Sequence, residues 1–318
     1  MTDRERLLDE LRSVSFAIAY RMLGSVSEAE DVVQEVLLRV HQTLDAGEKV
    51  ASPHAFTATV TTRLAINELK SARARREHYV GEWLPEPIIT DGQDDPAWQA
   101  EIADSLSLAV LVLLERLSPE QRAVLVLHDV FEYGYAEISE IVGKTEDNVR
   151  QIASRARHHV ALRRPRFQTT RAQRDELAQR FFAAAEQGDI AGLEALLAHD
   201  VELTGDGGGK VPAFRRSLHG RSRVALTLIN GIRSLAELPG VSWRHVELNG
   251  GPGALVLDRE QHLIGVMALD ISAGQITNIS SILNPDKLAH LGPLADLTSL
   301  LGSWPTSPAP KSPDEEDA

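Results

Sequence analysis

The sequence predicts a multidomain protein in which two all-α modules precede an α+β domain with an antiparallel sheet. Three observations favour this fold class. Apolar residues recur with the helical period over roughly the first 160 residues, a Pro- and Gly-rich acidic stretch interrupts them near residue 81, and β-rich runs dominate after residue 240. The chain has 318 residues, which is long enough for two or three separate cores.

The first module is predicted at residues 3–80 and consists of helices joined by short turns. Apolar residues recur at helical spacing over 8–23, and Gly24 ends this helix. A second apolar stripe runs over 32–40. Pro53 suits the first turn of a third helix, because proline lacks the N–H that this position leaves unused.

A linker is predicted at residues 81–102, where three prolines and two glycines stand among acidic residues. The second module follows at 103–166. Within it, a helix at 135–142, Gly143 at the bend and a basic helix at about 145–162 form a helix-turn-helix pattern.

The third module is predicted at residues 170–290 as an α+β domain, because two helices at 174–187 and 190–198 give way to β-rich runs separated by glycines. Strands are expected at 241–248, 254–258, 262–271 and 275–283. Residues 291–318 end in a Pro- and Ser-rich stretch and the sequence DEEDA, so we expect a flexible acidic tail.

The amino-acid composition excludes several classes of function. A net charge of −13 argues against a protein that coats DNA through bulk electrostatics, although clustered Lys and Arg can still make local contacts. The sequence has no cysteine, which excludes disulfides and cysteine-ligated zinc. No stretch approaches the ~20 apolar residues that cross a bilayer. We therefore expect a cytoplasmic protein without a cofactor or a bound metal.

A basic helix at 63–76 is the first candidate DNA-binding site, since it carries five basic residues and one acid. Such a face can follow phosphates while an amide reads a base edge. The alternative is a solvated basic helix end. The candidate residues are Arg63, Asn67, Lys70, Arg73, Arg75 and Arg76.

The second basic cluster, at 144–166, carries seven basic residues and two acids. Its helix would be capped by Thr145, and the exposed face would enter a major groove. The alternative is a surface helix hairpin without a ligand. The candidate residues are Thr145, Asp147, Asn148, Arg150, Gln151, Ser154, Arg155 and Arg157.

These segments resemble the sigma-70 family of RNA polymerase subunits. The stretch SVSEAEDVVQEVLLRV is similar to the segment that docks on the polymerase, and the resemblance implies core polymerase binding by Asp31, Gln34, Glu35 and Leu38. The basic helix at 63–76 falls in the segment that melts and reads the minus-ten promoter element. The helix-turn-helix resembles the module that reads the minus-thirty-five element. Two modules with no third domain between them resemble the extracytoplasmic-function class.

A narrower resemblance rests on three short motifs, which are similar to those of the sigma-J type subgroup with a SnoaL-like extension. The motifs are WLPEP (Trp83, Leu84, Pro85, Glu86, Pro87), DGGGK (Asp206, Gly207, Gly208, Gly209, Lys210) and NPDKL (Asn284, Pro285, Asp286, Lys287, Leu288). The resemblance implies a cone-shaped domain with a curved antiparallel sheet. That domain would contact both sigma modules and the linker, and would take the place of a separate anti-sigma protein.

Two other functions stay open on the sequence alone. A helix-turn-helix regulator with a ligand-binding cone would act without polymerase, but it has no need of a helix that carries Asp31, Gln34 and Glu35. An enzyme would need a catalytic pair, and the carboxylates of the third module have no spacing that identifies one, so we expect regulation rather than catalysis. An unknown small ligand in the cone could shift the balance between two arrangements of the chain.

Overall fold

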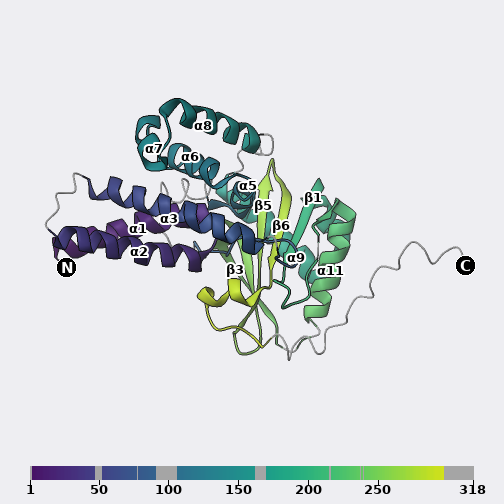
Figure 1. The fold of residues 1–318 in the computed structure, drawn as a ribbon. Helices are drawn as coiled ribbons and strands as arrows, with labels where there is room; N and C mark the ends of the chain where they lie inside the picture. Colours follow the sequence, from purple (N-terminus) through teal and green to yellow (C-terminus); the bar gives the residue numbers. More distant parts are fainter. Residues whose placement is uncertain are drawn as a thin grey trace, which may run out of the picture.

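The computed structural model describes residues 2–46, 52–76, 78–90, 106–161, 170–214, 216–236, 238 and 240–296. Two helical modules lie beside a sheet domain (Figure 1). The first helical module comprises α1 (Asp3–Leu23), α2 (Val26–Asp45) and α3 (Pro53–Arg76). The helix-turn-helix module comprises α5 (Leu108–Leu114), α6 (Pro119–Asp129), α7 (Tyr135–Val142) and α8 (Glu146–Ala161).

The C-terminal domain holds the remaining elements. They are α9 (Arg171–Gln187), α10 (Ile190–Leu196), β1 (Leu197–Asp206), β2 (Leu218–His219), α11 (Arg221–Ala236), β3 (Ser242–Leu248), β4 (Gly251–Leu257), β5 (Leu263–Ser272), β6 (Gln275–Ile282) and the short 3-10 turns η1 (Pro285–Lys287) and η2 (Ala289–Leu291). The predicted order, two helical modules followed by an α+β domain, is confirmed.

Local signals account for the helix ends. The Ser118 side chain accepts a hydrogen bond from the N–H of Gln121, and the Gln121 side chain accepts one from the N–H of Ser118. This capping box starts α6 where the sequence predicts a helix start. Gly143 ends α7 in the left-handed conformation at φ 68°. The bend of the helix-turn-helix therefore follows from one residue that tolerates a positive φ.

The sheet corrects one prediction, since it is mixed rather than antiparallel. Its six strands follow the order β2-β1-β6-β5-β4-β3, and β1 pairs with β6 in parallel while all other neighbours are antiparallel. The sequence predicts a helix up to residue 198 and no strand before residue 241, so it does not predict β1 or the short β2. The polar pair His199 and Asp200 interrupts the apolar pattern of β1, and the buried alternation resumes at Val201, Leu203 and Gly205. Helix α11 was also not predicted.

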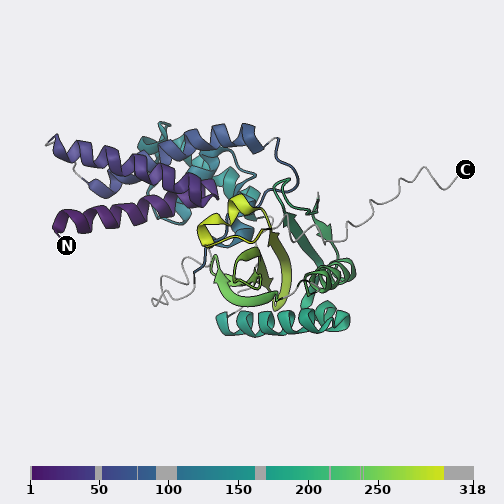
Figure 2. The ribbon, with the colours of Figure 1, turned by 90° about the horizontal axis from the view of Figure 1, so that it is seen from below.

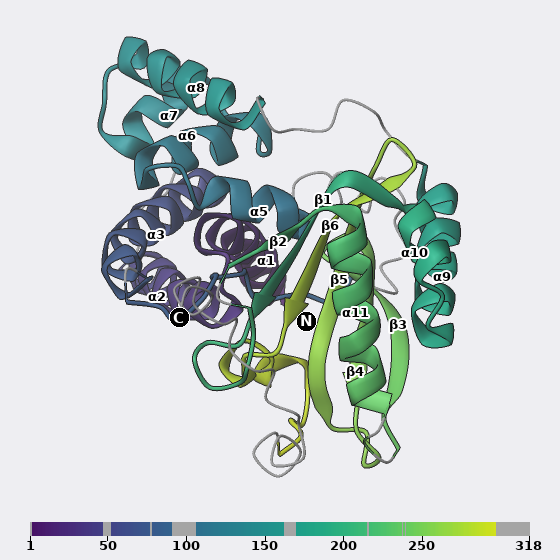
Figure 3. The ribbon, with the colours of Figure 1, turned by 90° about the vertical axis from the view of Figure 1, so that its right-hand side faces the viewer.

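The curved sheet, seen from below in Figure 2, carries buried residues on both faces. On β5, Met267 and Leu269 belong to the core formed with α9, α10 and α11, and α11 lies across that face in Figure 3. Their neighbours Val266 and Ala268 point the other way, into a core shared with the helical modules. A strand covered on both faces is expected to be a near-continuous apolar run, and β5 is one from Leu263 to Leu269. The C-terminal domain is therefore packed into the helical modules.

The segment after η2 remains attached to the sheet as far as the structure describes it. The Leu263 N–H donates to Pro293 O (2.8 Å), and the Ala295 N–H donates to Leu263 O (3.0 Å). The predicted tail boundary at 291 thus falls inside a bonded segment. The rest of that tail, residues 91–105 of the predicted linker and module boundary, and the side chains of Arg73 and Arg75 lie outside the described residues. None of the helices in the described parts has the length and apolar character needed to cross a membrane.

Candidate regulatory interface

The three short motifs meet at one buried ion pair. Lys287 Nζ lies 2.6 Å from Asp206 Oδ2, and the two side chains are 6% and 0% exposed. Asp206 also accepts hydrogen bonds from the hydroxyl of Tyr79 (2.5 Å) and from the N–H of Leu84 (2.8 Å). The Asn284 side-chain amide donates to the same Tyr79 hydroxyl (2.9 Å). We call these five residues the Asp206 cluster. It joins the C-terminal domain to the linker and to the chain leaving α3.

Lys287 also binds the linker directly, because its ammonium donates to the carbonyl of Leu84. The ammonium lies 4.2 Å from the ring centroid of Trp83 and 4.9 Å from that of Tyr79. Burial lowers the pKa of Lys287 to about 8, and the neighbouring Asp206 carboxylate opposes that shift. Burial and the hydrogen bond to Asp206 raise the pKa of the Tyr79 hydroxyl, so the hydroxyl keeps its proton and donates a hydrogen bond.

The glycines of DGGGK are required by close approach. Gly208 has φ 60°, and a Cβ built there would lie 2.3 Å from the side-chain amide nitrogen of Asn284. At Gly207, a Cβ would meet the carbonyl oxygen of Val211 at 2.1 Å. At the end of the motif, Lys210 pairs with Asp286 of NPDKL (2.6 Å) on the surface. DGGGK and NPDKL therefore touch through both buried and exposed residues.

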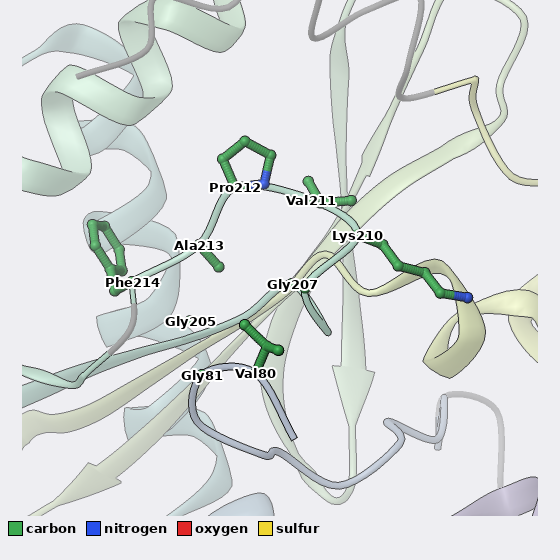
Figure 4. Close-up of a pocket in the computed structure, with 10 residues that line it drawn as sticks. Val80, Gly81, Gly205, Gly207, Lys210, Val211, Pro212, Ala213 and Phe214 are labelled. Atoms are coloured by element: carbon green, nitrogen blue, oxygen red, sulfur yellow. The ribbon is translucent and has the colours of Figure 1, made fainter. Parts of the chain in front are cut away.

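A cavity of about 340 Å³ adjoins this loop (Figure 4). Val80 and Gly81 of the segment that follows α3 form one side of it. The DGGGK loop and the chain after it form the other side, with Gly205, Gly207, Lys210, Val211, Pro212 and Phe214 among the lining residues. In Figure 4 the Lys210 side chain extends away from the other labelled side chains, in keeping with its surface pair.

Glu86 of WLPEP closes the amino end of α2. Its carboxylate accepts hydrogen bonds from the N–H groups of Val26 (2.7 Å) and Ser27 (3.1 Å) and from the hydroxyl of Ser25 (2.7 Å). The Glu86 N–H donates to Gly24 O (2.8 Å). A carboxylate at a helix N-terminus satisfies free N–H groups and favours the helix dipole. The linker is thereby bonded to the first helical module as well as to the C-terminal domain.

Two arginines connect the first helical module with the helix-turn-helix module. Arg122, 2% exposed, donates to Met22 O (2.5 Å) and to the Glu115 carboxylate (2.7 Å). Arg76 binds the other oxygen of Glu115, and its guanidinium lies 3.8 Å from the ring centroid of Trp83. Arg76 was predicted to bind DNA, but in this structure it is committed to protein contacts.

The other predicted minus-ten residues are divided. Arg63 donates to the carbonyls of Glu140 and Ile141 at the end of α7, both at 2.9 Å. Asn67 and Lys70 are exposed on α3. Arg63, Asn67 and Lys70 are thus all exposed, and Arg63 and Arg76 also contact the helix-turn-helix module.

The predicted polymerase-binding residues share one face of α2. Asp31 and Gln34 are exposed, Leu38 is 52% exposed, and Glu35 pairs with Arg39 (2.8 Å). The opposite face of α2 is buried in the module core.

The predicted minus-thirty-five residues lie on α8 and just before it. Thr145 Oγ1 accepts the Asn148 N–H (3.4 Å) at the helix start. Among them, Arg150 pairs with Glu146 and lies 4.6 Å from the Tyr135 ring, while Arg157 Nε lies 3.1 Å from the Asp129 carboxylate. The exposed members are Thr145, Asp147, Asn148, Arg150, Gln151, Ser154, Arg155 and Arg157.

Sequence reasoning missed a further set of interface residues, the turn between β3 and β4 with the residues it contacts. Asn249 of this turn is fully buried and hydrogen-bonded to Tyr20 of α1. The Asn-Gly-Gly pattern signals a hairpin turn, and nothing in that local pattern reveals a partner in the first helix. A second unpredicted contact to the linker comes from His290 of η2, whose Nε2 donates to Pro87 O (2.7 Å).

A three-helix module, an extended linker and a helix-turn-helix define a transcription initiation factor of the sigma-70 type. A family model described as Sigma-70 region 2 matches residues 7–75, and one described as Sigma-70, region 4 matches residues 107–160. The chain is 35% identical over 291 residues to the ECF RNA polymerase sigma factor SigJ of Mycobacterium tuberculosis, covering 88% of this chain and 91% of that relative. It is 30% identical to the probable ECF RNA polymerase sigma factor SigI of the same species, covering 86% and 91%.

The structural comparison agrees with the sequence comparison. The crystal structure of the M. tuberculosis extracytoplasmic function sigma factor SigJ matches with a TM-score of 0.71 and 32% identity, covering 88% of this chain and 98% of that one. The chain therefore belongs to the ECF RNA polymerase sigma factors. Members of this family bind core RNA polymerase and promoter DNA, and they are initiation factors rather than enzymes.

Proposed function

We propose that this sigma factor directs promoter-specific transcription initiation and is inhibited by its own C-terminal domain, which holds the two DNA-binding modules together. The buried pair of Asp206 and Lys287, closed over the backbone of Leu84, is the observation that carries the proposal. A buried charge pair of this kind is costly unless each charge is fully bonded, and here the linker supplies part of the bonding.

The packing of α3 against α6 and α7, which we call the closed arrangement, supports inhibition. Elements centred near positions minus ten and minus thirty-five lie about 25 base pairs apart, or roughly 85 Å along B-DNA at 3.4 Å per base pair. Helices in direct contact do not reach both elements. The closed arrangement therefore has to open before both modules bind one promoter.

We assign the residue roles as follows. The exposed face of α2, with Asp31, Gln34, Glu35 and Leu38, binds core polymerase, and the acidic and amide groups suit a basic partner. The exposed face of α8 reads the upstream element in the major groove. Asn67 and Lys70 contact the minus-ten element, joined after opening by Arg63 and Arg76.

Run-off transcription with core polymerase tests the proposal. Asp206→Asn leaves Lys287 as an unpaired buried charge, so the closed arrangement is weakened and run-off product rises several-fold. The matched control is Lys210→Met, which removes the exposed pair with Asp286, whose side chains are 54% and 64% exposed. Such pairs contribute about 0–1 kcal/mol, so this variant transcribes like the unmodified chain.

Equal transcription by the unmodified chain and by Asp206→Asn would refute inhibition through this cluster, provided that the variant keeps its helical circular dichroism. A pull-down of the full chain with core polymerase checks the family assignment separately. The Asp206→Asn variant should bind polymerase more tightly than the unmodified chain.

A further inference from the structure

The turn between β3 and β4 is a hairpin tip buried inside the protein. Its two central residues, Asn249 and Gly250, have φ 52° and 73°, and two such residues in a row are the mark of a type I′ turn. Asn-Gly is the favoured sequence for that geometry, so the turn alone explains the residue types. Hairpin tips usually lie at the surface, however, whereas Asn249 is 0% exposed.

Each polar hydrogen of the Asn249 side chain is used. Its Nδ2 donates to the hydroxyl of Tyr20 (2.8 Å) and to the carbonyl of Leu106 (3.0 Å). Its Oδ1 accepts the N–H of Ile88 (2.9 Å), and its own N–H donates to Ile88 O (2.9 Å). One side chain thus bridges α1, the linker and the segment that enters α5.

Neighbouring groups fix this tip in place. The Gly250 N–H donates to the hydroxyl of Thr90 (3.0 Å), which itself donates to the Glu247 carboxylate (2.9 Å). Ile89 pairs with Leu248 as an antiparallel bridge. The linker therefore adds a short strand-like contact to the end of the hairpin, and Asn249 is held rigidly between the modules.

The tip and the Asp206 cluster contact different parts of the chain. Within the cluster, Asp206 bonds to Tyr79, in the chain that leaves α3, and to Leu84 of the linker. Asn249 bonds to Leu106, at the entry of the helix-turn-helix module.

We propose that Asn249 is a positioning residue that sets the helix-turn-helix module against α1, independently of the Asp206 cluster. This proposal rests on the proposed function in one respect: the closed arrangement that Asn249 stabilises is taken to be the inhibited state. A glycine would satisfy the positive φ but lose the amide. An aspartate would keep the size and the turn, but it would place a carboxylate oxygen against the carbonyl of Leu106 where a donor is needed.

The absence of cysteine from the sequence allows a direct test on the full chain. Spin labels at Ser13→Cys in α1 and His159→Cys in α8 report the distance between the first helical module and the helix-turn-helix module. Labels at Ser13→Cys and Ser222→Cys in α11 report the distance to the C-terminal domain. All three positions are exposed. Pulsed electron paramagnetic resonance then gives both distance distributions.

Asn249→Gly and Asn249→Asp are expected to lengthen and broaden the distribution between α1 and α8 while leaving the maximum between α1 and α11 unchanged. Tyr20→Phe leaves the hairpin sequence unchanged and removes the hydroxyl that accepts from the Asn249 amide and donates to Glu86 O (2.6 Å), and it should lengthen the same distribution by a smaller amount. It also keeps the test valid should the Asn249 variants fold poorly.

Two results would overturn the proposal. Unchanged distributions in all three variants would show that Asn249 positions nothing. Equal lengthening of both distributions would show that the tip is not independent of the Asp206 cluster.

Run-off transcription on the same variants separates the two proposals. If the Asn249 variants lengthen the distance between α1 and α8 but make no more transcript, the positioning role stands and inhibition by this arrangement is refuted. If Asp206→Asn makes more transcript while the Asn249 variants show no change in distance, inhibition stands and the positioning role is refuted.

Discussion

Arg63 of α3 donates a 2.9 Å hydrogen bond from its Nε to the main-chain carbonyl of Ile141 in α7. The last carbonyls of a helix have no partner within it, and a guanidinium there both bonds them and complements the helix dipole. The residue predicted to touch promoter DNA is thus used to join the two modules that read DNA. In this arrangement Nε and Nη2 of Arg63 are both bonded to main-chain carbonyls of α7.

Removing the Arg63 guanidinium should loosen this contact. We expect Arg63→Gln to lower the free energy of unfolding by about 0.5–1 kcal/mol in urea titrations, because the α7 carbonyls lose a cationic donor. The control is Lys70→Gln, an exposed cation on the same helix, for which we expect a change within about 0.5 kcal/mol. Similar losses in the two variants would contradict the role of Arg63.

The DGGGK loop should be less tolerant than other turns to an added methyl group. Gly208→Ala combines a left-handed backbone with a clash against Asn284, whereas Gly274→Ala, at φ 73° in the β5–β6 turn, meets nothing within 4 Å. We expect Gly274→Ala to cost about 1–2 kcal/mol from backbone conformation alone and Gly208→Ala to cost clearly more. Thermal unfolding of both variants checks the order, and equal costs would rule out the close approach.

Lys287 should give the protein a distinctive dependence on pH. Its folded pKa of about 8 lies below the ordinary value of 10.5, so between these values the unfolded chain binds a proton that the folded chain has released. The contribution of Lys287 to the free energy of unfolding therefore rises as the pH increases through this window, by at most about 3 kcal/mol.

The measurement is the difference between the unmodified chain and Lys287→Met in urea titrations from pH 7.5 to about 10. Subtracting the variant removes the contributions of groups common to both chains. If the free energies of unfolding of the two chains depend on pH in parallel, the pKa of Lys287 is not lowered in the folded protein.

The exposed face of α8 should read sequence. Replacing Gln151 by Ala should change the base preference in the upstream promoter element, at a cost of about 1–3 kcal/mol for the preferred base. We assign Arg157, the last of these candidates along α8, to a phosphate contact, so Arg157→Ala should instead weaken binding to all sequences alike. A promoter library transcribed with each variant distinguishes the two, and an unchanged preference in Gln151→Ala would refute the base contact.

The sequence predicted the helical modules well because their signals are local. A serine cap followed by proline starts α6, and Gly143 ends α7, where the pattern indicated. Strand β1 was missed because it follows α10 without a break and carries His199 and Asp200 near its start. The parallel pairing of β1 with β6 could not be seen until β1 was known to be a strand.

The interface could be predicted only in part. The resemblance named Asp206, Lys287 and Leu84, and the structure brings these three together at one place. Asn249 could not be found in this way, since its sequence signal is fully explained by a tight turn. Its partners are fixed by tertiary packing, which local patterns do not encode.

The contact between Tyr20 and Asn249 joins residues 229 positions apart. At a synthesis rate of about 5–20 residues per second, roughly ten to fifty seconds separate their emergence from the ribosome. During that interval the amino-terminal helices exist without the hairpin that later contacts them. In a newly made molecule this contact therefore forms only after both helical modules have been synthesised.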